Sequence, residues 1–216
     1  LLKMFECFED AAVPKGVVNL VMGRPGEIAE EFMANPICRK VSFTGSTAVG
    51  KDLMRLAADS IKRVSLELGG HAPVLIFEDV DVEQAARMSV TGKFRNNGQV
   101  CISPTRFYVH QRTQKEFTEA TVAFTRENKL GNGLDDGVDV GPMFESKALE
   151  KTQQMVEQAV DVGARVLTGG QRAAQFEKGY FYEPTVLTDV TREAAIMTEE
   201  PFAPIMPILS FEQLDE

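Results

Sequence analysis

Cys101 has the surroundings that favour a reactive thiol. It lies in the stretch KFRNNGQVCISPTRF, with Arg95, Asn97 and Gln99 within a few residues. A nearby cation favours the thiolate, which is the nucleophilic form of cysteine. The alternative is a buried cysteine that behaves as a small apolar residue, the commoner role of a single cysteine. Cys7 and Cys38 lie on or beside helical runs, and we expect both to be structural.

Glu67 interrupts the strand-like run RVSLELGG, which is otherwise rich in Val and Leu. A carboxylate at this position either faces solvent at an edge or is buried for a purpose. Burial raises the pKa of a carboxyl group, which suits a general base near neutral pH. Gly69 and Gly70 follow it and permit a sharp turn or the close approach of a ligand. Glu67 is therefore a candidate base, with a charge at a strand end as the simpler interpretation.

Residues 45–51, GSTAVGK, have the glycine spacing of a P-loop followed by its lysine. A P-loop carries Ser or Thr after the lysine to place a hydroxyl on Mg²⁺, and here that position is Asp52. We therefore expect no hydrolysis of nucleoside triphosphates. The glycines still suit a tight turn, and the helix that follows offers free N–H groups to an anion. The pattern leaves open both a phosphate contact and plain strand–turn–helix packing.

The segment TEEPFAPIMPI, residues 198–208, joins two acids to a proline-rich apolar run. Prolines favour an extended path, on which Glu200 and Phe202 would point the same way. Such a pair could hold a sugar hydroxyl and a flat ring, and an acidic loop with a packing Phe is the alternative.

His71 and His110 are the only imidazoles, so a thiol hydrolase would have to pair Cys101 with one of them.

Alternating helices and strands must position these residues. We expect helices at residues 1–12, 25–35, 46–59, 81–97, 113–128 and 145–162. We expect strands at residues 16–23, 40–45, 62–70, 72–78, 105–111, 164–170 and 180–190. This alternation is typical of an α/β protein whose mainly parallel sheets are covered by helices. Asn96, Asn97 and Gly98 should end a helix and leave Cys101 on a turn ahead of a strand.

The composition narrows the function classes. The chain has 216 residues, enough for one large domain or parts of two, and a net charge of −9. Lys and Arg form no cluster, so we expect no nucleic-acid partner. No apolar run approaches the roughly 20 residues that span a membrane. Three cysteines without a CxxC pair argue against a zinc site and suit a reducing compartment, which we take to be the cytoplasm.

In this order the motifs resemble the NAD(P)-dependent aldehyde dehydrogenase superfamily. The matching stretches are FTGSTAVG (43–50), LELGG (66–70), FRNNGQVC (94–101), GPM (141–143), YFYEPTVLTDV (180–190) and EEPFAP (199–204). The resemblance runs essentially from residue 1 to 216. It implies part of a Rossmann-type cofactor domain at residues 1–70 and most of an α/β catalytic domain at residues 71–216. It also implies that Cys101 is the nucleophile and Glu67 the general base, with NAD or NADP as cofactor.

The resemblance assigns further residues to the two ligands. It implies six for the cofactor, the first three at the pyrophosphate and the others at the nicotinamide and its ribose: Gly45, Ser46, Gly50, Leu68, Glu200 and Phe202. Arg95 matches the arginine with which succinate-semialdehyde dehydrogenases hold the distant carboxylate of their substrate, and the surrounding stretch also resembles 2-oxoglutarate-semialdehyde dehydrogenases. We therefore expect an ω-carboxylated semialdehyde, with Val100 and Ile102 beside it. Arg95 bracing its loop is the alternative.

Departures from the family pattern leave other functions open. Ser103 stands where some relatives carry a second, redox-active cysteine, so we expect no such disulfide, and Ala203 stands where a glycine is usual. The family's upstream Pro-Trp-Asn motif is missing, so we expect part of a longer chain and no aldehyde oxidation by residues 1–216 alone.

A CoA-acylating relative would typically lack Glu67, and a truncated module without activity is a further alternative. The resemblance implies a homo-oligomer, a dimer or tetramer, for the full-length form.

Overall fold

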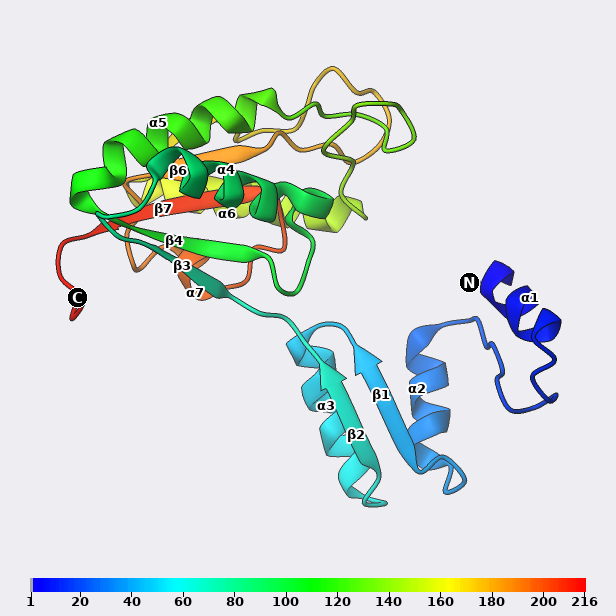
Figure 1. The fold of residues 1–216 in the computed structure, drawn as a ribbon. Coiled ribbons are helices and arrows are strands. Elements are labelled where there is room, and N and C mark those ends of the chain that lie inside the picture. The colour runs from blue at the N-terminus through cyan, green and yellow to red at the C-terminus, as the bar shows by residue number, and fades with distance from the viewer. Residues whose placement is uncertain (1) are drawn as a thin grey trace. The chain divides into compact units, whose positions relative to one another are not determined.

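The computed structural model describes residues 2–216, which form two compact units, one ending at Leu68 and the other running from Gly69 to Glu216 (Figure 1). Each unit has a sheet of its own. The predicted division at residue 70 lies two residues beyond this boundary, and the assignment of the two parts to cofactor binding and catalysis stays a prediction. Among residues 2–216 no helix combines the length and apolar character that a membrane crossing requires.

The first unit is a small β-α-β arrangement with two further helices. Its elements are α1 (Leu2–Asp10), α2 (Pro25–Ala34), β1 (Lys40–Thr44), α3 (Thr47–Ala58) and β2 (Arg63–Glu67). β1 and β2 are parallel, with Thr44 opposite Glu67 at their carboxyl ends. Alternate residues of the two strands turn toward α2 and α3, where they surround the buried core residues Met33, Leu53 and Ala57.

The strand predicted at residues 16–23 is wrong. The chain between α1 and α2 forms turns and irregular segments, and the side chains of Val17 and Val21 are 68% and 61% exposed. A strand needs a neighbour for its backbone N–H and C=O groups. None of the sheets in the described part of the chain includes this segment. Its run of β-branched residues therefore gave a false signal.

The second unit contains a five-stranded sheet in the order β3-β4-β7-β6-β5. Its strands are β3 (Ala72–Ile76), β4 (Pro104–His110), β5 (Arg165–Thr168), β6 (Thr185–Thr188) and β7 (Ile205–Phe211). β3, β4, β7 and β6 run parallel, and β5 joins β6 antiparallel. The α/β class and the mainly parallel sheet predicted from the sequence are confirmed. The chain after β7 forms turns.

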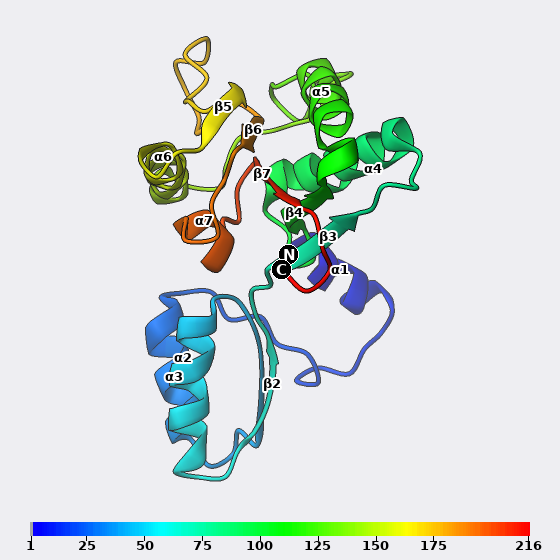
Figure 2. The same ribbon diagram turned by 90° about the vertical axis from the view of Figure 1, so that its left-hand side faces the viewer.

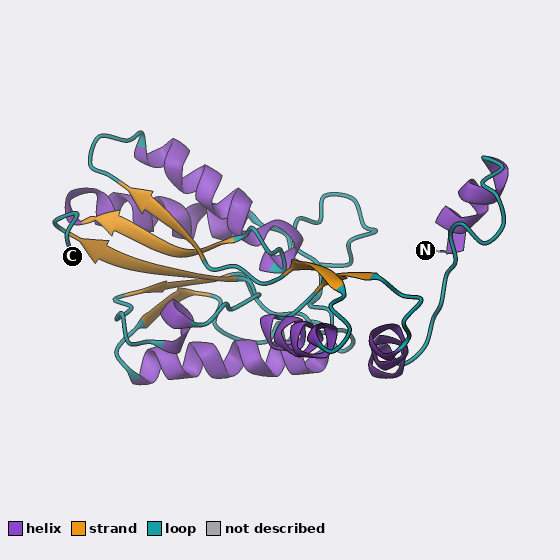
Figure 3. Ribbon diagram, turned by 90° about the horizontal axis from the view of Figure 1, so that it is seen from below, coloured by secondary structure: helices purple, strands orange, loops and turns teal. Residues whose placement is uncertain are grey.

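Helices cover both faces of this sheet (Figures 2 and 3). One side holds α4 (Val82–Phe94) and α5 (Gln111–Glu127), and the other holds α6 (Ser146–Asp161) and the short α7 (Ala195–Thr198). Alternation along the strands supplies both cores: Met206 of β7 packs with α4 and α5, whereas Ile205 packs with α6 and α7. Strands covered on both faces read as continuous apolar runs, as IMPIL of β7 does.

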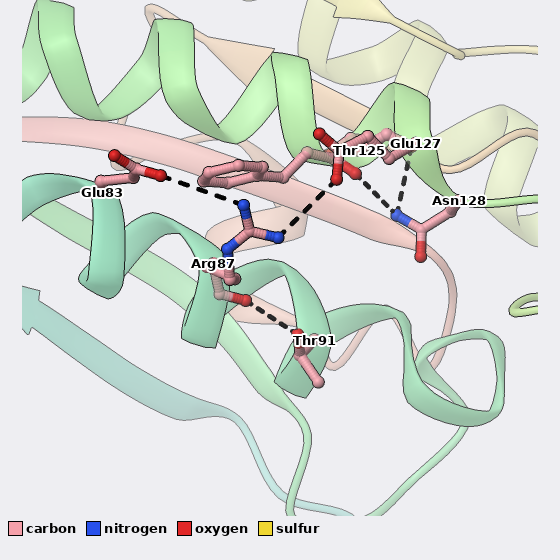
Figure 4. A network of polar contacts seen from close by, with 7 residues as sticks. Glu83, Arg87, Thr91, Thr125, Glu127 and Asn128 are labelled. Atoms are coloured by element: carbon pink, nitrogen blue, oxygen red, sulfur yellow. Dashed lines mark hydrogen bonds and ion pairs between the residues drawn. The ribbon is translucent and has the colours of Figure 1, made fainter.

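Arg87 links α4 to α5 at the surface (Figure 4). Its guanidinium lies 3.9 Å from the centroid of the Phe124 ring and 3.7 Å from a carboxylate oxygen of Glu127, both on α5. A second carboxylate, that of Glu83 one turn earlier on α4, is 4.0 Å away. The three charged side chains are more than half exposed, so the ion pairs stabilise little, and the cation–π contact adds about 0.5–1 kcal/mol between the two helices.

The helix predicted at residues 81–97 ends three residues early, at Phe94. It continues as the 3₁₀ turn η1 (Arg95–Gly98), in which Asn96 and Asn97 have φ values of 48° and 59°. Asn adopts this left-handed conformation more readily than most residues, because its short amide can bond to the local backbone. The side-chain amide of Asn96 donates to the Gln99 carbonyl at 2.9 Å. The Asn-Asn-Gly sequence therefore ends α4 as the sequence predicted.

Candidate active site

Cys101 lies on an exposed turn between η1 and β4, as predicted. The backbone N–H of Cys101 donates no hydrogen bond to any residue in the described range 2–216. Arg95 and Ile102 are also exposed, and Val100 is half-buried. The turn itself is fixed by backbone bonds, from Gln99 N–H to the Asn96 carbonyl and from Ser103 N–H to the Val100 carbonyl. These are 3.0 and 2.9 Å long. The thiol is thus exposed on a hydrogen-bonded turn, next to a backbone N–H that makes no bond within the described chain.

Three chemically interesting segments enter the sheet at one edge. Gly69 and Gly70 lead into β3, Cys101 leads into β4, and Glu200 leads into β7. These strands are adjacent and parallel, so their amino ends meet at the same edge. The structure therefore brings together a glycine pair, a thiol and a carboxylate from distant parts of the sequence.

The two glycines allow the closest of these approaches. A Cβ on Gly70 would lie 2.6 Å from the Cys101 carbonyl oxygen, and a Cβ on Gly69 would collide with a carboxylate oxygen of Glu200. Both distances are shorter than packed atoms accept, so any side chain here would displace the backbone of Cys101 or the carboxylate of Glu200. We expected a close approach at this pair. In the structure it is made by the protein itself, namely by the backbone of Cys101 and the carboxylate of Glu200.

Glu200 and Phe202 do not lie on an extended chain. Phe202 has a φ of 40°, which places it in the left-handed region. The extended path on which we expected the two side chains to point the same way is therefore wrong at Phe202. The carboxylate atom Oε1 of Glu200 is buried without a hydrogen-bond partner in the described chain, and Phe202 is half-buried. A buried acceptor without a donor is costly, and this oxygen of Glu200 has an unused capacity to accept a hydrogen bond.

Neither imidazole forms a hydrogen bond with Cys101 in residues 2–216. His110 ends β4, where it accepts a bond from the Arg112 N–H, and a seven-residue strand puts it about 20 Å from the turn of Cys101. His71 places Nδ1 2.7 Å from the Thr105 hydroxyl. Burial and the nearby Arg106 hold the pKa of His71 below its usual value. The structure therefore gives no support to a Cys–His hydrolase.

The remaining predicted residues belong to the first unit. Glu67 ends β2 and is exposed, so it is not a buried carboxylate in this structure, and its carbonyl accepts the Gly45 N–H at 3.0 Å. Ser46 caps α3 by accepting the Val49 N–H at 3.4 Å. The predicted strand–turn–helix around Gly45 is confirmed. Gly45 and Ser46 are exposed at the start of α3.

Gly50 makes a packing contact. It is buried inside α3, and a Cβ on it would lie 2.6 Å from a methyl group of Leu68, which is itself half-buried. Gly50 thus lets α3 approach the chain that follows β2. Its predicted role at a cofactor, like that of Leu68, stays a prediction.

Lys93 is a buried residue that the motif analysis missed. It lies in the last turn of α4 with 0% exposure, and its Nζ has no hydrogen-bond partner among residues 2–216. Burial lowers the pKa of Lys93 to about 7, although the attraction of Glu200 acts in the opposite direction. The helical spacing of Val82, Ala86 and Val90 carries the buried face of α4 to Lys93, so periodicity was the signal that could have found it.

Residues 1–216 match the family model described as "Aldehyde dehydrogenase family". The chain belongs to the aldehyde dehydrogenase family. The resemblance inferred from its motifs is thereby confirmed.

Two sequence relatives illustrate where this aldehyde dehydrogenase chain lies in the family. A glutarate-semialdehyde dehydrogenase of Pseudomonas putida is 42% identical over 210 residues, which cover 97% of this chain and 43% of that protein. An Escherichia coli succinate-semialdehyde dehydrogenase, named for NADP(+), is 42% identical over 93% of this chain and 41% of that protein. This chain therefore spans less than half the length of these relatives.

The fold agrees with that of solved family members. A crystal structure of succinate-semialdehyde dehydrogenase from Burkholderia pseudomallei matches with a TM-score of 0.95 at 41% identity, over 98% of this chain and 44% of that one. The fold of this aldehyde dehydrogenase chain is thus the family's fold over the part that is present.

Proposed function

We propose that the protein oxidises an aldehyde, specifically an ω-carboxylated semialdehyde, to the acid with NAD(P)⁺. The observation that carries the proposal is the exposed Cys101 thiol on a rigid turn, beside Glu200 and the Gly69–Gly70 pair, in a chain of the aldehyde dehydrogenase family. The name of the E. coli relative, which includes NADP(+), supports this class of cofactor.

The residues of the chain fit a nicotinamide dinucleotide. The exposed N-terminal turn of the twelve-residue α3, with Gly45 and Ser46, suits a pyrophosphate because free N–H groups and the helix dipole attract anions. The unpartnered Oε1 of Glu200 suits a ribose hydroxyl, which would satisfy it. Gly50, Leu68 and Phe202 complete the cofactor set that we propose.

The reaction that we propose begins at the thiol of Cys101. The Cys101 thiolate adds to the aldehyde carbon, forming a C–S bond while the carbonyl electron pair moves to oxygen. The Cys101 N–H, which is free of other bonds, holds this oxyanion. When bound, NAD(P)⁺ would supply the acceptor for the hydride of that carbon. A thioester on Cys101 remains, Glu67 takes a proton from the water that attacks it, and the acid leaves as the thiolate is restored.

The substrate class rests on Arg95 and on the names of the relatives. Arg95 is exposed six residues before Cys101, and a guanidinium binds a carboxylate through two parallel hydrogen bonds. The relatives named for glutarate and succinate semialdehydes act, by those names, on aldehydes with a carboxylate at the far end. We propose the same class here, with Val100 and Ile102 beside the aldehyde.

The test is a substrate and cofactor matrix. The longest natural chain that carries these residues would be assayed for reduction of NAD⁺ and NADP⁺ with succinate semialdehyde, glutarate semialdehyde and matched aldehydes without the carboxylate. We expect the semialdehydes to be preferred at least tenfold and Arg95→Ala to reduce this preference. Cys101→Ala should abolish turnover, and Cys7→Ala, its matched control, should not. We expect no turnover from residues 1–216 alone.

Two results would overturn the proposal. Full oxidation by Cys101→Ala would contradict the nucleophile, and turnover that requires added CoA and yields acyl-CoA in place of the free acid would replace water by CoA as the acceptor.

A further inference from the structure

Lys93 lies at the junction of the nucleophile turn and the segment that carries Glu200. A Cβ on Gly98, the last residue of η1, would lie 3.2 Å from Lys93 Nζ and would collide with the Ala203 carbonyl oxygen. Gly98 has a φ of 70° and is buried. The ammonium group therefore sits where the start of the Cys101 turn meets residues 200–203.

The charged groups around Lys93 come from three elements. Glu200, ahead of β7, is the carboxylate that attracts it. His71, ahead of β3, is close enough for the charge of Lys93 to act on it, and Arg106 of β4 lies behind His71, donating to its carbonyl at 2.6 Å. Glu200 is thus the single acid that faces Lys93 among the described residues that act on its charge.

Both members of this pair are incompletely bonded. Lys93 Nζ and Glu200 Oε1 are buried, neither has a hydrogen-bond partner in residues 2–216, and the two do not reach ion-pair distance. An unpaired ammonium in the interior costs free energy that an apolar side chain of similar size would avoid. A packing role alone does not account for a lysine at this position.

We propose that Lys93 is a positioning residue, whose buried ammonium restrains the Glu200 carboxylate beside the nucleophile turn so that it can accept the ribose hydroxyls of the cofactor. This inference rests on the proposed function, because it presumes that Glu200 meets NAD(P)⁺. Lys93 itself touches neither substrate nor cofactor and acts through Glu200.

The proposal implies a pH dependence with a defined direction. Since burial lowers the pKa of Lys93 to about 7, its charge is present at pH 6 and largely lost at pH 9. Attraction to Glu200 should fade over this interval. Affinity for NAD(P)⁺ should therefore fall as the pH rises from 6 to 9, and this fall should disappear once Lys93 is replaced by a neutral residue.

The experiment measures cofactor binding by calorimetry at pH 6 and pH 9, on the longest natural chain that carries these residues. The variants are Lys93→Met, Lys93→Arg, Glu200→Gln and the double variant, with Lys115→Met on the exposed face of α5 as the matched control. At pH 6 we expect Lys93→Met to raise the Kd for NAD(P)⁺ about tenfold, because attraction between two charges that are not in direct contact is still appreciable where water is largely excluded. At pH 9 it should differ little from wild type. Lys93→Arg, which keeps the charge at both pH values, should bind independently of pH.

A double-mutant comparison separates the ways of failing. In the Glu200→Gln background, Lys93→Met should add nothing. If Glu200→Gln weakens binding but Lys93→Met does not, the positioning role is wrong and the proposed function stands. If wild type does not bind NAD(P)⁺, or if Glu200→Gln binds as wild type does, the proposed cofactor site is wrong. Where Lys93→Met does not fold, wild-type affinity that is constant from pH 6 to 9 overturns the inference by itself.

Discussion

Replacing Lys93 by Met should flatten the pH dependence of stability of the second unit. The pKa of Lys93 is lowered from 10.5 to about 7 in the folded protein. Between these values the unfolded chain binds a proton that the folded chain does not, so the free energy of unfolding rises with pH in this window. The destabilising contribution of Lys93 is thus absent above pH 10.5 and grows as the pH falls toward 7.

The size of the effect follows from the two pKa values. A shift of 3.5 units (10.5 − 7) corresponds to about 5 kcal/mol over the full window, and the part that falls between pH 7 and pH 9 is about 2 kcal/mol. Met fills a similar volume without a charge and should remove this part. At pH 7 the variant should also be more stable than wild type by a few kcal/mol, because the cost of the unpaired buried ammonium disappears.

Urea unfolding at pH 7, 8 and 9 would test this. The quantity is the difference between wild type and Lys93→Met, in which the contributions of the groups that the two proteins share cancel. Lys115→Met, on the exposed surface of α5, should keep the wild-type slope. If wild type and Lys93→Met gain the same stability between pH 7 and pH 9, Lys93 does not lose its charge there, and the argument from its burial is wrong.

Three further predictions concern close contacts in the two units. Gly70→Ala places a Cβ 2.6 Å from the Cys101 carbonyl oxygen, so it should shift the nucleophile turn and lower the rate of thiol alkylation or turnover at least tenfold; an unchanged rate would contradict this packing. Gly50→Ala should destabilise the first unit by about 1–3 kcal/mol in urea unfolding, because its Cβ would overlap Leu68, and a neutral result would mean that Leu68 moves freely. Ser46→Ala should cost about 1 kcal/mol through loss of the α3 cap, whereas Ser46→Asp should restore it, and equal melting of all three proteins would show that the 3.4 Å bond contributes nothing.

Local chemistry in the sequence predicted the local structure well. Asn96, Asn97 and Gly98 correctly indicated that a helix ends ahead of Cys101, because few other residues tolerate left-handed backbone there. The glycine turn at Gly45 likewise lies between a strand and a helix. The failures came from long-range context. Residues 16–23 have strand-forming side chains but no neighbouring strand in the described chain.

Lys93 shows a second limit. A lysine in a helix is usually solvated, and only the buried face shared with Val90 and Phe94 indicated otherwise. The environment that lowers its pKa comes in part from Glu200, more than a hundred residues away in sequence. No motif around Lys93 indicates that Glu200 lies nearby, and none around Glu200 indicates Lys93. Only the arrangement of the strands in the fold identifies the pair.

The strand order explains why the candidate site exists where it does. β3, β4 and β7 are neighbours, yet β7 follows β4 by almost a hundred residues. Because the three strands are parallel, every segment that precedes them arrives at the same edge, and the glycine pair, the Cys101 turn and Glu200 arrive there together. This is the amino edge of the sheet, opposite to the carboxyl edge at which open α/β sheets usually bind ligands. A side chain that stiffens this edge therefore acts on the thiol and the carboxylate at once, and Lys93, lying against Gly98 and facing Glu200, is in that position.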